Sequence, residues 1–285
     1  MLHCGRSFTD MVKSGIILVD KPRGPSSHQT AAWVGEILNT SIGHSGTLDP
    51  MVSGVLVVMI GKAVKLAPLL LQHEKEYIAC MRLHADVPRA SLEDVVRGFT
   101  GRIYQRPPRR SAVKRSLRIR VIHKIEVLDV SGRLVLLRVK CEAGTYIRSL
   151  CVHIGNVLGC GAQMIELRRT MSGGFTVADA HTLQEIRDAT ERGEADSLIL
   201  PPEAAISDIP KIIIRDSAAD AVYHGAVLAV PGIISCDDFR VKQSVALVTE
   251  SGKLAALAEA FLDADKIRAK NHGLAARSVR VFTAE

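Results

Sequence analysis

The chain has 285 residues, and 47% of them are hydrophobic, which suits one or two globular domains and excludes a largely disordered chain. The formal net charge of +7 favours a polyanionic partner over an acidic surface role. Only 4% of the residues are aromatic, which argues against nucleic-acid binding through many stacked bases and favours contacts with phosphates.

Cysteine spacing and the N-terminus limit the class of protein further. The six cysteines form no C-x-x-C pair and no zinc-type grouping, so we expect reduced thiols in apolar surroundings. The N-terminus lacks the apolar region of a signal peptide. Lys62 and Lys65 interrupt the longest apolar stretch before it could span a bilayer. The sequence therefore predicts a soluble, intracellular protein.

Short strands and helices alternate in the first part of the chain, after an irregular arm over 1–14. Apolar runs and alternation predict strands over 15–20, 54–61 and 77–83. Cap and periodicity signals predict helices beginning at Ser26 or Ser27, over about 62–72, and from Ser91. The inner face of the first helix is expected to carry Ala32, Trp33, Ile37 and Leu38.

The segment 43–50, with the sequence Gly-His-Ser-Gly-Thr-Leu-Asp-Pro, lies between the first helix and the second strand. Its glycines permit positive φ, and Pro50 moves Asp49 out of the helical region. The segment is therefore predicted to be a tight, non-helical loop that presents the carboxylate of Asp49 beside a buried strand. A plain turn before a core strand accounts for the same residues, and local chemistry alone favours it.

Positive charge dominates the middle of the chain. From Arg102 to Lys124 there are nine Lys or Arg residues and no Asp or Glu. Runs of charge are usually a solvated surface face, but this one-sided run favours contact with an RNA backbone. Beyond it we expect strands near 123–130, 133–141 and 163–169, and helices starting after Gly144 and at Thr182.

Pro201, Pro202 and Pro210 mark the expected domain boundary. After it, short apolar runs at turn-rich spacing predict a compact, mostly β module. The predicted strands of this module are 212–214, 226–230, 244–248 and 278–282. We therefore divide the chain into domains over 1–205 and 206–285.

Three side chains and the basic run fit chemistry on a nucleobase. Asp49 is a candidate nucleophile or acid–base group, and Arg148, at the start of a helix, could pair with it and keep it ionised. Tyr77 can stack on a base and offer a hydroxyl. With a cationic groove for phosphates, such a set suits a base that has been turned out of its stack.

The motif at 43–50 resembles the catalytic motif of the pseudouridine synthases related to bacterial tRNA pseudouridine synthase and dyskerin. Other motifs of that family follow in its order over about 15–175: Lys21-Pro22, Lys75-Glu76-Tyr77, Gly144 to Arg148, and Leu-Arg-Arg-Thr-x-Ser-Gly from Leu167 to Gly173. The tail from about 206 is similar to a PUA domain, including Gly-Leu-Ala-Ala-Arg from Gly273 to Arg277. Several ordered motifs together make this resemblance specific.

The branch of the family is indicated by the stretch from Pro107 to Arg115. Bacterial tRNA enzymes carry a long insertion shortly after it, whereas here it leads almost directly to the strand near 123–130. The arginine-rich stretch and the PUA tail resemble the archaeal and eukaryotic dyskerin branch, the catalytic subunit of H/ACA ribonucleoproteins. Without long Lys-rich tails the chain looks archaeal. It departs from the family at Gly173-Gly174, where Gly-Pro is usual, and in its short arm.

The resemblance implies a role for each matching residue. Asp49 would be the essential catalytic group, Arg148 would pair with it, and Tyr77 would stack on the target base. Lys21 would support the loop, with a reactive role as the alternative. His44 would assist extrusion of the base, and Leu167 would pack beside it, although a hydrogen-bonded loop histidine and ordinary core packing account for these two equally well. No metal or organic cofactor is implied.

RNA binding is assigned to two groups of residues. The basic run would place Arg109, Arg110, Lys114 and Arg115 on the RNA backbone. The PUA segment would hold the trinucleotide end of a guide RNA through residues drawn from Tyr223, Gly225, Lys266, Arg268, Lys270 and Arg277. The partners implied are H/ACA guide RNA, rRNA and tRNA substrates, accessory proteins of the Gar and Nop types, and a kink-turn-binding ribosomal-type protein.

The sequence thus predicts a mixed α+β catalytic domain with a central mixed, largely antiparallel sheet, followed by a small β-rich PUA domain. Its expected function is RNA-guided conversion of uridine to pseudouridine in the cytoplasm of an archaeal-type cell. A stand-alone tRNA T-loop pseudouridine synthase is the alternative. A catalytically silent RNA-binding scaffold is a third hypothesis, which the joint presence of Asp49, Tyr77 and Arg148 disfavours.

Overall fold

The computed structural model describes residues 13–107 and 116–282. The chain divides into two compact units between Ile199 and Leu200, and each is described by itself. Most of the expected arm over 1–14 lies outside the described residues. So do four of the expected RNA contacts, namely Arg109, Arg110, Lys114 and Arg115.

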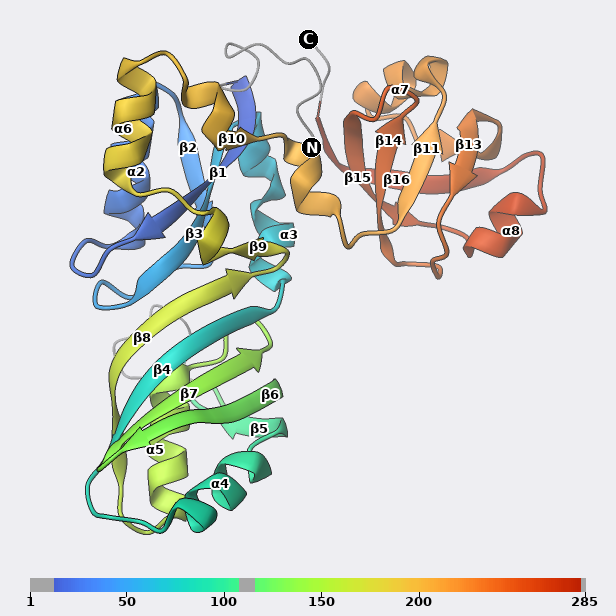
Figure 1. The fold of residues 1–285 in the computed structure, drawn as a ribbon. Coiled ribbons are helices and arrows are strands. Elements are labelled where there is room, and N and C mark those ends of the chain that lie inside the picture. The colour runs from blue at the N-terminus through green and yellow to red at the C-terminus, as the bar shows by residue number, and fades with distance from the viewer. Residues whose placement is uncertain (1–12, 108–115, 283–285) are drawn as a thin grey trace. The chain divides into compact units, whose positions relative to one another are not determined.

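A ten-stranded mixed sheet forms the framework of the first unit (Figure 1). Its main path, in spatial order, is β10 (Ile199–Leu200), β1 (Ser14–Lys21), β3 (Ser53–Gly61), β8 (Ala162–Ser172), β4 (Lys75–Leu83), β7 (Leu134–Cys141), β6 (Arg118–Ser131) and β5 (Gly101–Gln105). Off this path, β2 (Ile42–Ser45) pairs with β3 and β9 (Phe175–Thr176) with β8. Only β3 and β8 run parallel among the paired strands β1 to β9, which confirms the predicted largely antiparallel sheet.

The parallel pairing of β3 with β8 is short and very close. Ser53 lies opposite Arg168, and Gly54 lies opposite Arg169. Gly54 has φ 106°, and a Cβ there would lie 2.1 Å from the carbonyl oxygen of Arg169. Only glycine permits this approach of the two backbones.

The first helix, α2 (Ser27–Leu38), corrects one sequence prediction. Ser26 caps it by accepting a hydrogen bond from the Gln29 amide, as expected. The buried face, however, carries Ala31, Val34 and Leu38, which pack with apolar residues of β1 and β3. Trp33, predicted to lie inside, is 37% exposed, because the face that meets the sheet follows the helical spacing of Ala31, Val34 and Leu38 and leaves position 33 off it.

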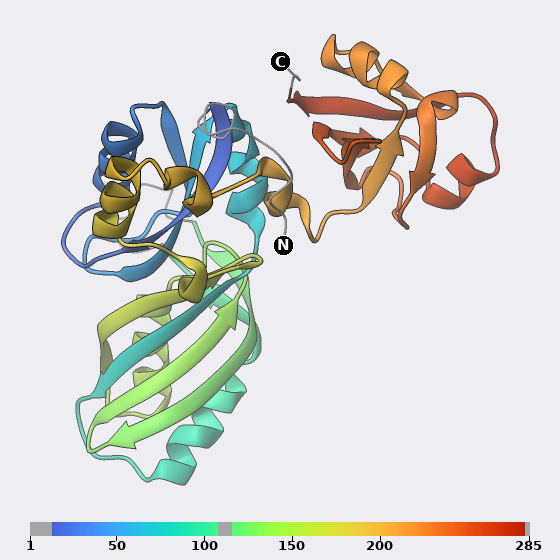
Figure 2. The same cartoon turned by 45° about the horizontal axis from the view of Figure 1, so that its top comes forward.

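The remaining helices of the unit are close to expectation. The predicted helix 62–72 is a 3₁₀ turn, η1 (Lys62–Leu66), followed by α3 (Ala67–Gln72), whose first turn contains a proline. Two helices, α4 (Arg89–Gly98) and α5 (Ile147–Val157), contribute to one core with β4, β6 and β7 (Figure 2). The last helix, α6 (Leu183–Glu191), begins with the capping box of Thr182 and Glu185. Short 3₁₀ turns η2 (Val177–Asp179) and η3 (Ala195–Leu198) flank it.

The basic run contains more strand than the sequence indicated. Residues 101–105 form β5, which was not predicted, and β6 starts at Arg118 rather than near 123. The two strands pair with Gly101 opposite Ile122 and Gln105 opposite Arg118. This pairing leaves β5 at the end of the sheet path, with β6 as its neighbour.

The second unit contains a six-stranded sheet with the order β12, β16, β15, β14, β11, β13. Its strands are β11 (Lys211–Ile214), β12 (Leu228–Ala229), β13 (Ile233–Cys236), β14 (Ser244–Thr249), β15 (Leu254–Ala260) and β16 (Leu274–Val281). The sequence did not predict β13 and β15, nor the helices α7 (Asp216–Tyr223) and α8 (Ala264–Arg268). The 3₁₀ turns η4 (Pro202–Ile206) and η5 (Val230–Gly232) also belong here.

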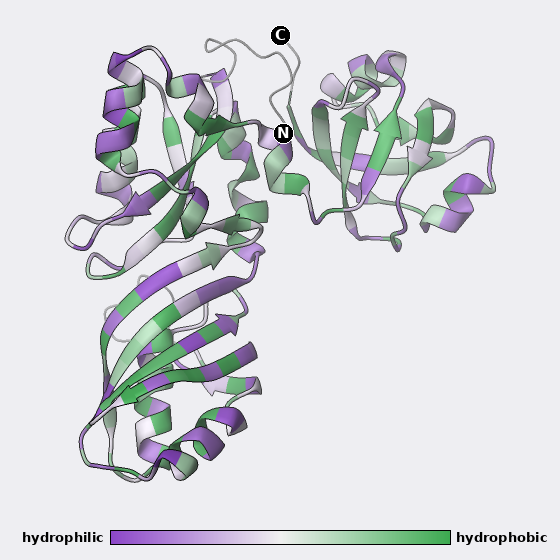
Figure 3. Cartoon of the chain, viewed as in Figure 1, coloured by the Kyte–Doolittle hydropathy of each residue, from purple (hydrophilic) through white to green (hydrophobic). Residues whose placement is uncertain are grey.

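One predicted strand of the second unit is mostly wrong. Of the run 226–230, only Leu228 and Ala229 are in a strand, because Pro231 lies in the 3₁₀ turn that follows. Apolar residues of the central strands form the core of the unit, as their colouring shows (Figure 3). Among the described residues, no helix has the length and apolar character that crossing a membrane requires.

Candidate active site

Asp49 lies in the connection between β2 and β3. The first part of the predicted loop is in fact strand, since β2 extends through Ser45. The chain then turns at Gly46, which has φ 72°, and the Val52 amide donates to the Asp49 carbonyl over 2.9 Å. The result is a tight turn next to the fully buried strand β3, with the Asp49 side chain 61% exposed.

Arg148, from the first turn of α5, reaches this carboxylate. Its Nη2 lies 2.6 Å from Oδ2 of Asp49, a charge-assisted hydrogen bond between residues far apart in the chain. The arginine side chain is 50% exposed, so the pair is accessible to a ligand. The structure therefore brings together two of the three residues expected to do chemistry and leaves them at the surface.

Two buried side chains, Lys21 and Ser27, bond to the main chain of the Asp49 loop. Lys21 is fully buried, and its Nζ donates to the carbonyl oxygens of Pro22, Pro50 and Val52 over 2.8, 3.2 and 2.8 Å. Burial and the nearby Arg169 cation lower the pKa of Lys21, whereas Asp49 raises it. Ser27 accepts from the Leu48 amide over 2.7 Å and donates to the Leu48 carbonyl over 3.0 Å. Lys21 thus has the supporting contacts that the sequence suggested, and Ser27 adds a second support that it did not.

Tyr77 lies on β4, opposite Arg169 of β8. Burial raises the pKa of the Tyr77 hydroxyl, and the cation and hydrogen bond of Arg169 oppose that shift. Arg169 is itself 1% exposed, and its Nε donates to the Val55 carbonyl over 2.8 Å. Among the described residues its Nη2 has no hydrogen-bond partner. The phenol of Tyr77 therefore sits beside a buried, incompletely paired cation.

A third buried cation, Lys75, lies under the same loop. Its Nζ donates to the carbonyls of Leu70 and His73 over 3.1 and 2.7 Å. Burial lowers its pKa to about 8, and the Arg169 cation acts in the same direction. A Cβ at Gly46 would lie 3.2 Å from Nη1 of Arg169 and 3.6 Å from Cε of Lys75. Glycine at 46 thus lets the loop pack closely against the side chains of Arg169 and Lys75.

Sequence reasoning gave no role to Ser27, Lys75 or Arg169. Lys75 and Arg169 lie inside the family motifs described above, next to residues that were assigned roles. The only signal for both was their place in these motifs, because β4 and β8 each carry other charged residues that make no single cation stand out. For Ser27 there was none beyond its place near a helix start.

The surroundings of Leu167 fit both of the roles expected for it, whereas His44 lies on a strand rather than in a loop. His44 lies on β2, and burial, His28 and Arg169 all lower the pKa of its ring, so it is mainly neutral at pH 7. Its Nδ1 is buried without a hydrogen-bond partner among the described residues. Leu167 is 7% exposed in the core cluster that contains Leu48, with Tyr77 packed against that cluster.

The described residues contain no group of three or more His, Cys, Asp or Glu side chains that could hold a metal ion. The five described cysteines are free thiols. Burial raises the pKa of both Cys141 and Cys151 to about 12, so these two are protonated and inert at neutral pH.

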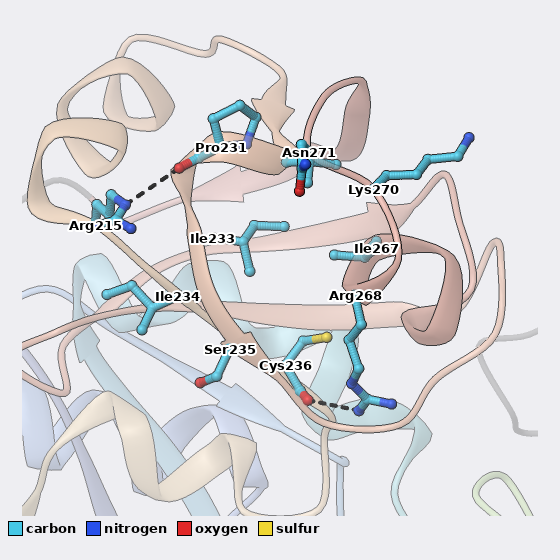
Figure 4. Close-up of a pocket in the computed structure, with 11 residues that line it drawn as sticks. Arg215, Pro231, Ile233, Ile234, Ser235, Cys236, Ile267, Arg268, Lys270 and Asn271 are labelled. Carbon is cyan, nitrogen blue, oxygen red and sulfur yellow. Dashed lines mark hydrogen bonds between the residues drawn. The ribbon is translucent and has the colours of Figure 1, made fainter.

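The second unit has a pocket of about 480 Å³ between β13 and α8 (Figure 4). Its charged lining residues are Arg215, Arg268 and Lys270. Arg268 donates to the Cys236 carbonyl over 2.9 Å and forms ion pairs with Asp238 and Asp265 over 2.8 and 3.2 Å. Lys270 extends away from the other lining side chains in Figure 4.

The other RNA-binding residues that the sequence suggested for the second unit lie outside this lining. Lys266 forms an ion pair with Asp263 over 3.1 Å, and Arg277 is exposed on β16. Tyr223 ends α7, where burial raises the pKa of its hydroxyl, and Gly225 follows in the turn. The pocket thus gathers Arg268 and Lys270 of the expected set, and adds Arg215, which was not predicted.

Comparison with known proteins gives consistent matches along the chain. The model described as "TruB family pseudouridylate synthase (N terminal domain)" matches residues 36–147. Two further models match 148–207, described as "tRNA pseudouridylate synthase B C-terminal domain", and 210–282, described as "PUA domain". Together they cover most of both units.

Two similar relatives are proteins named "Probable tRNA pseudouridine synthase B". Those of Methanosarcina barkeri and Archaeoglobus fulgidus are each 47% identical over 286 residues, covering 97% of this chain and 85% and 88% of the relatives. Among solved structures, "Crystal Structure of a Cbf5-Nop10-Gar1 Complex" matches with a TM-score of 0.92 and 46% identity. "Structure of H/ACA RNP bound to a substrate RNA containing 2'-deoxyuridine" matches with 0.91 and 43%. Both matches cover 98% of this chain and 88% of the other.

Proposed function

Because the chain belongs to the TruB family of pseudouridylate synthases, we propose that Asp49 is its catalytic residue and that Arg148 and Tyr77 complete the catalytic set. The enzyme converts uridine in RNA to pseudouridine. The observation that carries the assignment is the 2.6 Å contact between Asp49 and Arg148, on a loop held by Lys21 and Ser27.

The reaction is an isomerisation and needs no external reactant. The bond between N1 of uracil and C1′ of ribose breaks, a bond between C5 and C1′ forms, C5 loses a proton, and N1 gains one. A carboxylate can serve such a sequence as nucleophile or as proton carrier. Arg148 orients the carboxylate of Asp49 through their 2.6 Å contact, and Tyr77 offers a stacking face and a hydroxyl beside Arg169.

We assign residues 1–205 to the catalytic domain and 206–285 to the PUA domain, which would bind RNA. The PUA match over 210–282 and the division of the chain at Ile199 and Leu200 support this boundary. Lys270 of the pocket and Arg277 of β16 remain the proposed contacts of this domain, while Arg268 is engaged by two carboxylates. In the catalytic domain Arg109, Arg110, Lys114 and Arg115 remain proposed backbone contacts.

The enzyme works under the direction of an H/ACA guide RNA, with rRNA as its main substrate. The likeness to Cbf5 in complex with Nop10 and Gar1, and to an H/ACA ribonucleoprotein with bound substrate RNA, supports this proposal. The strand β5 ends at Gln105 and β6 begins at Arg118, and this short connection agrees with the proposed guide-directed function. We propose proteins of the Nop10 and Gar1 type and a kink-turn-binding ribosomal-type protein as partners, in the cytoplasm of an archaeal-type cell.

Stand-alone modification of tRNA is the second candidate function. The relatives from Methanosarcina barkeri and Archaeoglobus fulgidus, both named as probable tRNA enzymes, favour it. A catalytically silent scaffold is disfavoured, since such a protein has no need for Asp49, Tyr77 and Arg148 together.

One experiment separates the two candidates. Pseudouridine formation is measured on an rRNA target and on a tRNA, each with and without a matching guide RNA and accessory proteins. We expect turnover of the rRNA target only in the complete mixture. Equal turnover of tRNA without guide RNA, and none of the rRNA target with it, would establish the stand-alone enzyme instead.

A further inference from the structure

The side chain of Gln105 is buried at the edge of the sheet in the catalytic unit. It is 2% exposed and is the last residue of β5, which ends the sheet path. Glutamine is mostly a surface residue, and a buried amide costs free energy unless its donors and its acceptor find partners. The partners of Gln105 are both in the main chain of a single residue.

That residue is Tyr146. Nε2 of Gln105 donates to the Tyr146 carbonyl over 3.0 Å, and Oε1 accepts from the Tyr146 amide over 2.9 Å. Two hydrogen bonds to one residue fix its position and its orientation, much as a neighbouring strand would. Gln105 therefore anchors the main chain at this point to the edge of the sheet.

Tyr146 is also the residue from which α5 starts. Its side chain makes no capping hydrogen bond, and its carbonyl already accepts from the Leu150 amide over 3.0 Å, the first bond of the helix. Unsupported first turns fray readily. Gln105 thus accepts from the amide of the N-cap residue, the bond that a Glu or Gln three residues into the helix makes in a capping box, and it does so from outside the helix.

Arg148 lies in that first turn, and its contact with Asp49 is exposed. The side chains are 50% and 61% exposed, so burial does not hold them together. Exposed ion pairs gain little, because ordering two flexible side chains offsets much of the attraction. The 2.6 Å contact therefore depends on how firmly each backbone is placed.

We propose that Gln105 is a positioning residue for pseudouridine formation, which holds the start of α5 so that Arg148 meets Asp49. This proposal rests on the catalytic roles proposed above for Asp49 and Arg148. Lys21 and Ser27 fix the carboxylate side of the pair, and Gln105 fixes the guanidinium side.

Gln105→Met in the complex assembled with guide RNA tests the proposal, because methionine keeps the length of the side chain and loses both hydrogen bonds. We expect the single-turnover rate to fall by about tenfold, since small misplacements of catalytic groups are costly, while substrate RNA binds within about twofold of normal. Thr145→Val is the matched control. It removes the 2.7 Å bond from Thr145 to the Glu142 carbonyl in the same turn and leaves Tyr146 held. An unchanged rate in Gln105→Met would overturn the proposal.

A double-mutant comparison distinguishes positioning from a general loss of structure. In the Arg148→Lys background, Gln105→Met should change the residual rate by less than about twofold, because the side chain that it positions has gone. An equal loss in both backgrounds would show that Gln105 acts elsewhere. If Gln105→Met does not fold, Gln105→Glu replaces it, since it keeps the acceptor for the Tyr146 amide and lacks the donor.

The guanidinium signals of Arg148 give a readout that needs no turnover. In ¹⁵N spectra they are identified by their loss in Arg148→Lys. We expect them to be unchanged in Thr145→Val and shifted or broadened in Gln105→Met. Unchanged signals in Gln105→Met would refute the positioning role even if the enzyme proves to have another substrate, so failure of the two proposals can be told apart.

Discussion

The Asp49 loop of the first unit and the pocket region of the second hold positive charge in opposite ways. Around the Asp49 loop, Lys21, Lys75 and Arg169 are buried, and main-chain carbonyls accept their hydrogen bonds. In the second unit, Arg268 and Lys266 are exposed and form ion pairs with aspartates, while Lys270 reaches outward. The buried cations hold the main chain in one conformation through its carbonyls. The exposed cations can instead leave their aspartates and bind RNA phosphates. Substitutions should therefore have large, local effects at the Asp49 loop and small, salt-dependent effects at the pocket of the second unit.

The strongest test of this contrast is Asp49→Asn, which removes the charge and keeps the size of the side chain. We expect pseudouridine formation to fall about 100- to 10,000-fold, the range for loss of a group that carries protons. Guide-RNA affinity should stay within about threefold, because the phosphate contacts are elsewhere. Asp179→Asn, at an exposed aspartate bonded to Thr176 in the same unit, is the control and should leave the rate unchanged. Retained turnover in Asp49→Asn would remove the basis of the assignment.

The cost of burying Lys75 predicts a dependence of stability on pH. Its pKa in the folded protein is about 8, below the usual 10.5 of an unfolded chain. Below pH 8 Lys75 is protonated in both the folded and the unfolded state, so the full cost of burying its charge lowers the free energy of unfolding. Between pH 8 and about 10.5 the unfolded state binds more protons, so the free energy of unfolding rises with pH, by up to about 3 kcal/mol.

Denaturant unfolding of the protein and of Lys75→Met, from pH 7 to 10.5, measures this contribution as a difference. Cys141 and Cys151, whose raised pKa values lower stability above pH 9, act alike in both proteins and cancel. If the difference in free energy of unfolding between the two proteins does not vary with pH, burial does not lower the pKa of Lys75.

Ser27→Ala removes the hydroxyl group that supports the Asp49 loop. The alanine variant leaves the amide and carbonyl of Leu48 without the hydroxyl that pairs with both, at a cost of about 1–3 kcal/mol. We expect lower stability together with slower turnover, since Asp49 follows directly. Ser26→Ala is a useful control, because it removes only the cap of α2. Similar slowing of turnover by both changes would contradict a specific effect on the loop.

Lys270→Gln should have the smallest effect. Loss of one phosphate contact lowers the slope of log affinity against log salt by about one, and catalysis by the bound complex should not change. Lys253→Gln, at an exposed lysine in the hairpin between β14 and β15, is the comparison and should leave the slope as it was. A slope unchanged by Lys270→Gln would place the RNA elsewhere on this unit.

Residue types and motifs singled out the residues to which we assign chemistry, and the structure brings two of them, Asp49 and Arg148, into contact. Asp49, Arg148 and Tyr77 were proposed because a carboxylate, a guanidinium and an aromatic ring stand at positions that match several family motifs in order, although local chemistry alone favoured a plain turn at Asp49. The mixed, largely antiparallel sheet and the later β-rich unit were also predicted correctly. These features depend on side-chain chemistry and on the alternation of apolar residues, which a sequence displays directly.

Gln105 and Ser27 were not found, because their importance depends on which main-chain atoms lie beside them after folding. Each binds the backbone of a residue far along the chain, and the residue type alone does not indicate this. Trp33 shows the converse error. This large apolar side chain was predicted to lie inside, whereas the buried face carries Ala31, Val34 and Leu38, so size was a poor guide to which face met the sheet.

The close parallel contact of Gly54 with Arg169 has a consequence for folding. It joins β3 to β8 after a long intervening stretch of chain, whereas the hairpin of β6 and β7 pairs neighbouring segments. Closing a long loop costs more entropy than closing a short one, so the local pairs can form early and this contact later. The bond from Arg169 to the Val55 carbonyl needs that same approach of β3 and β8, so the cations Lys21 and Arg169 are expected to meet beside the Asp49 loop only near the end of folding.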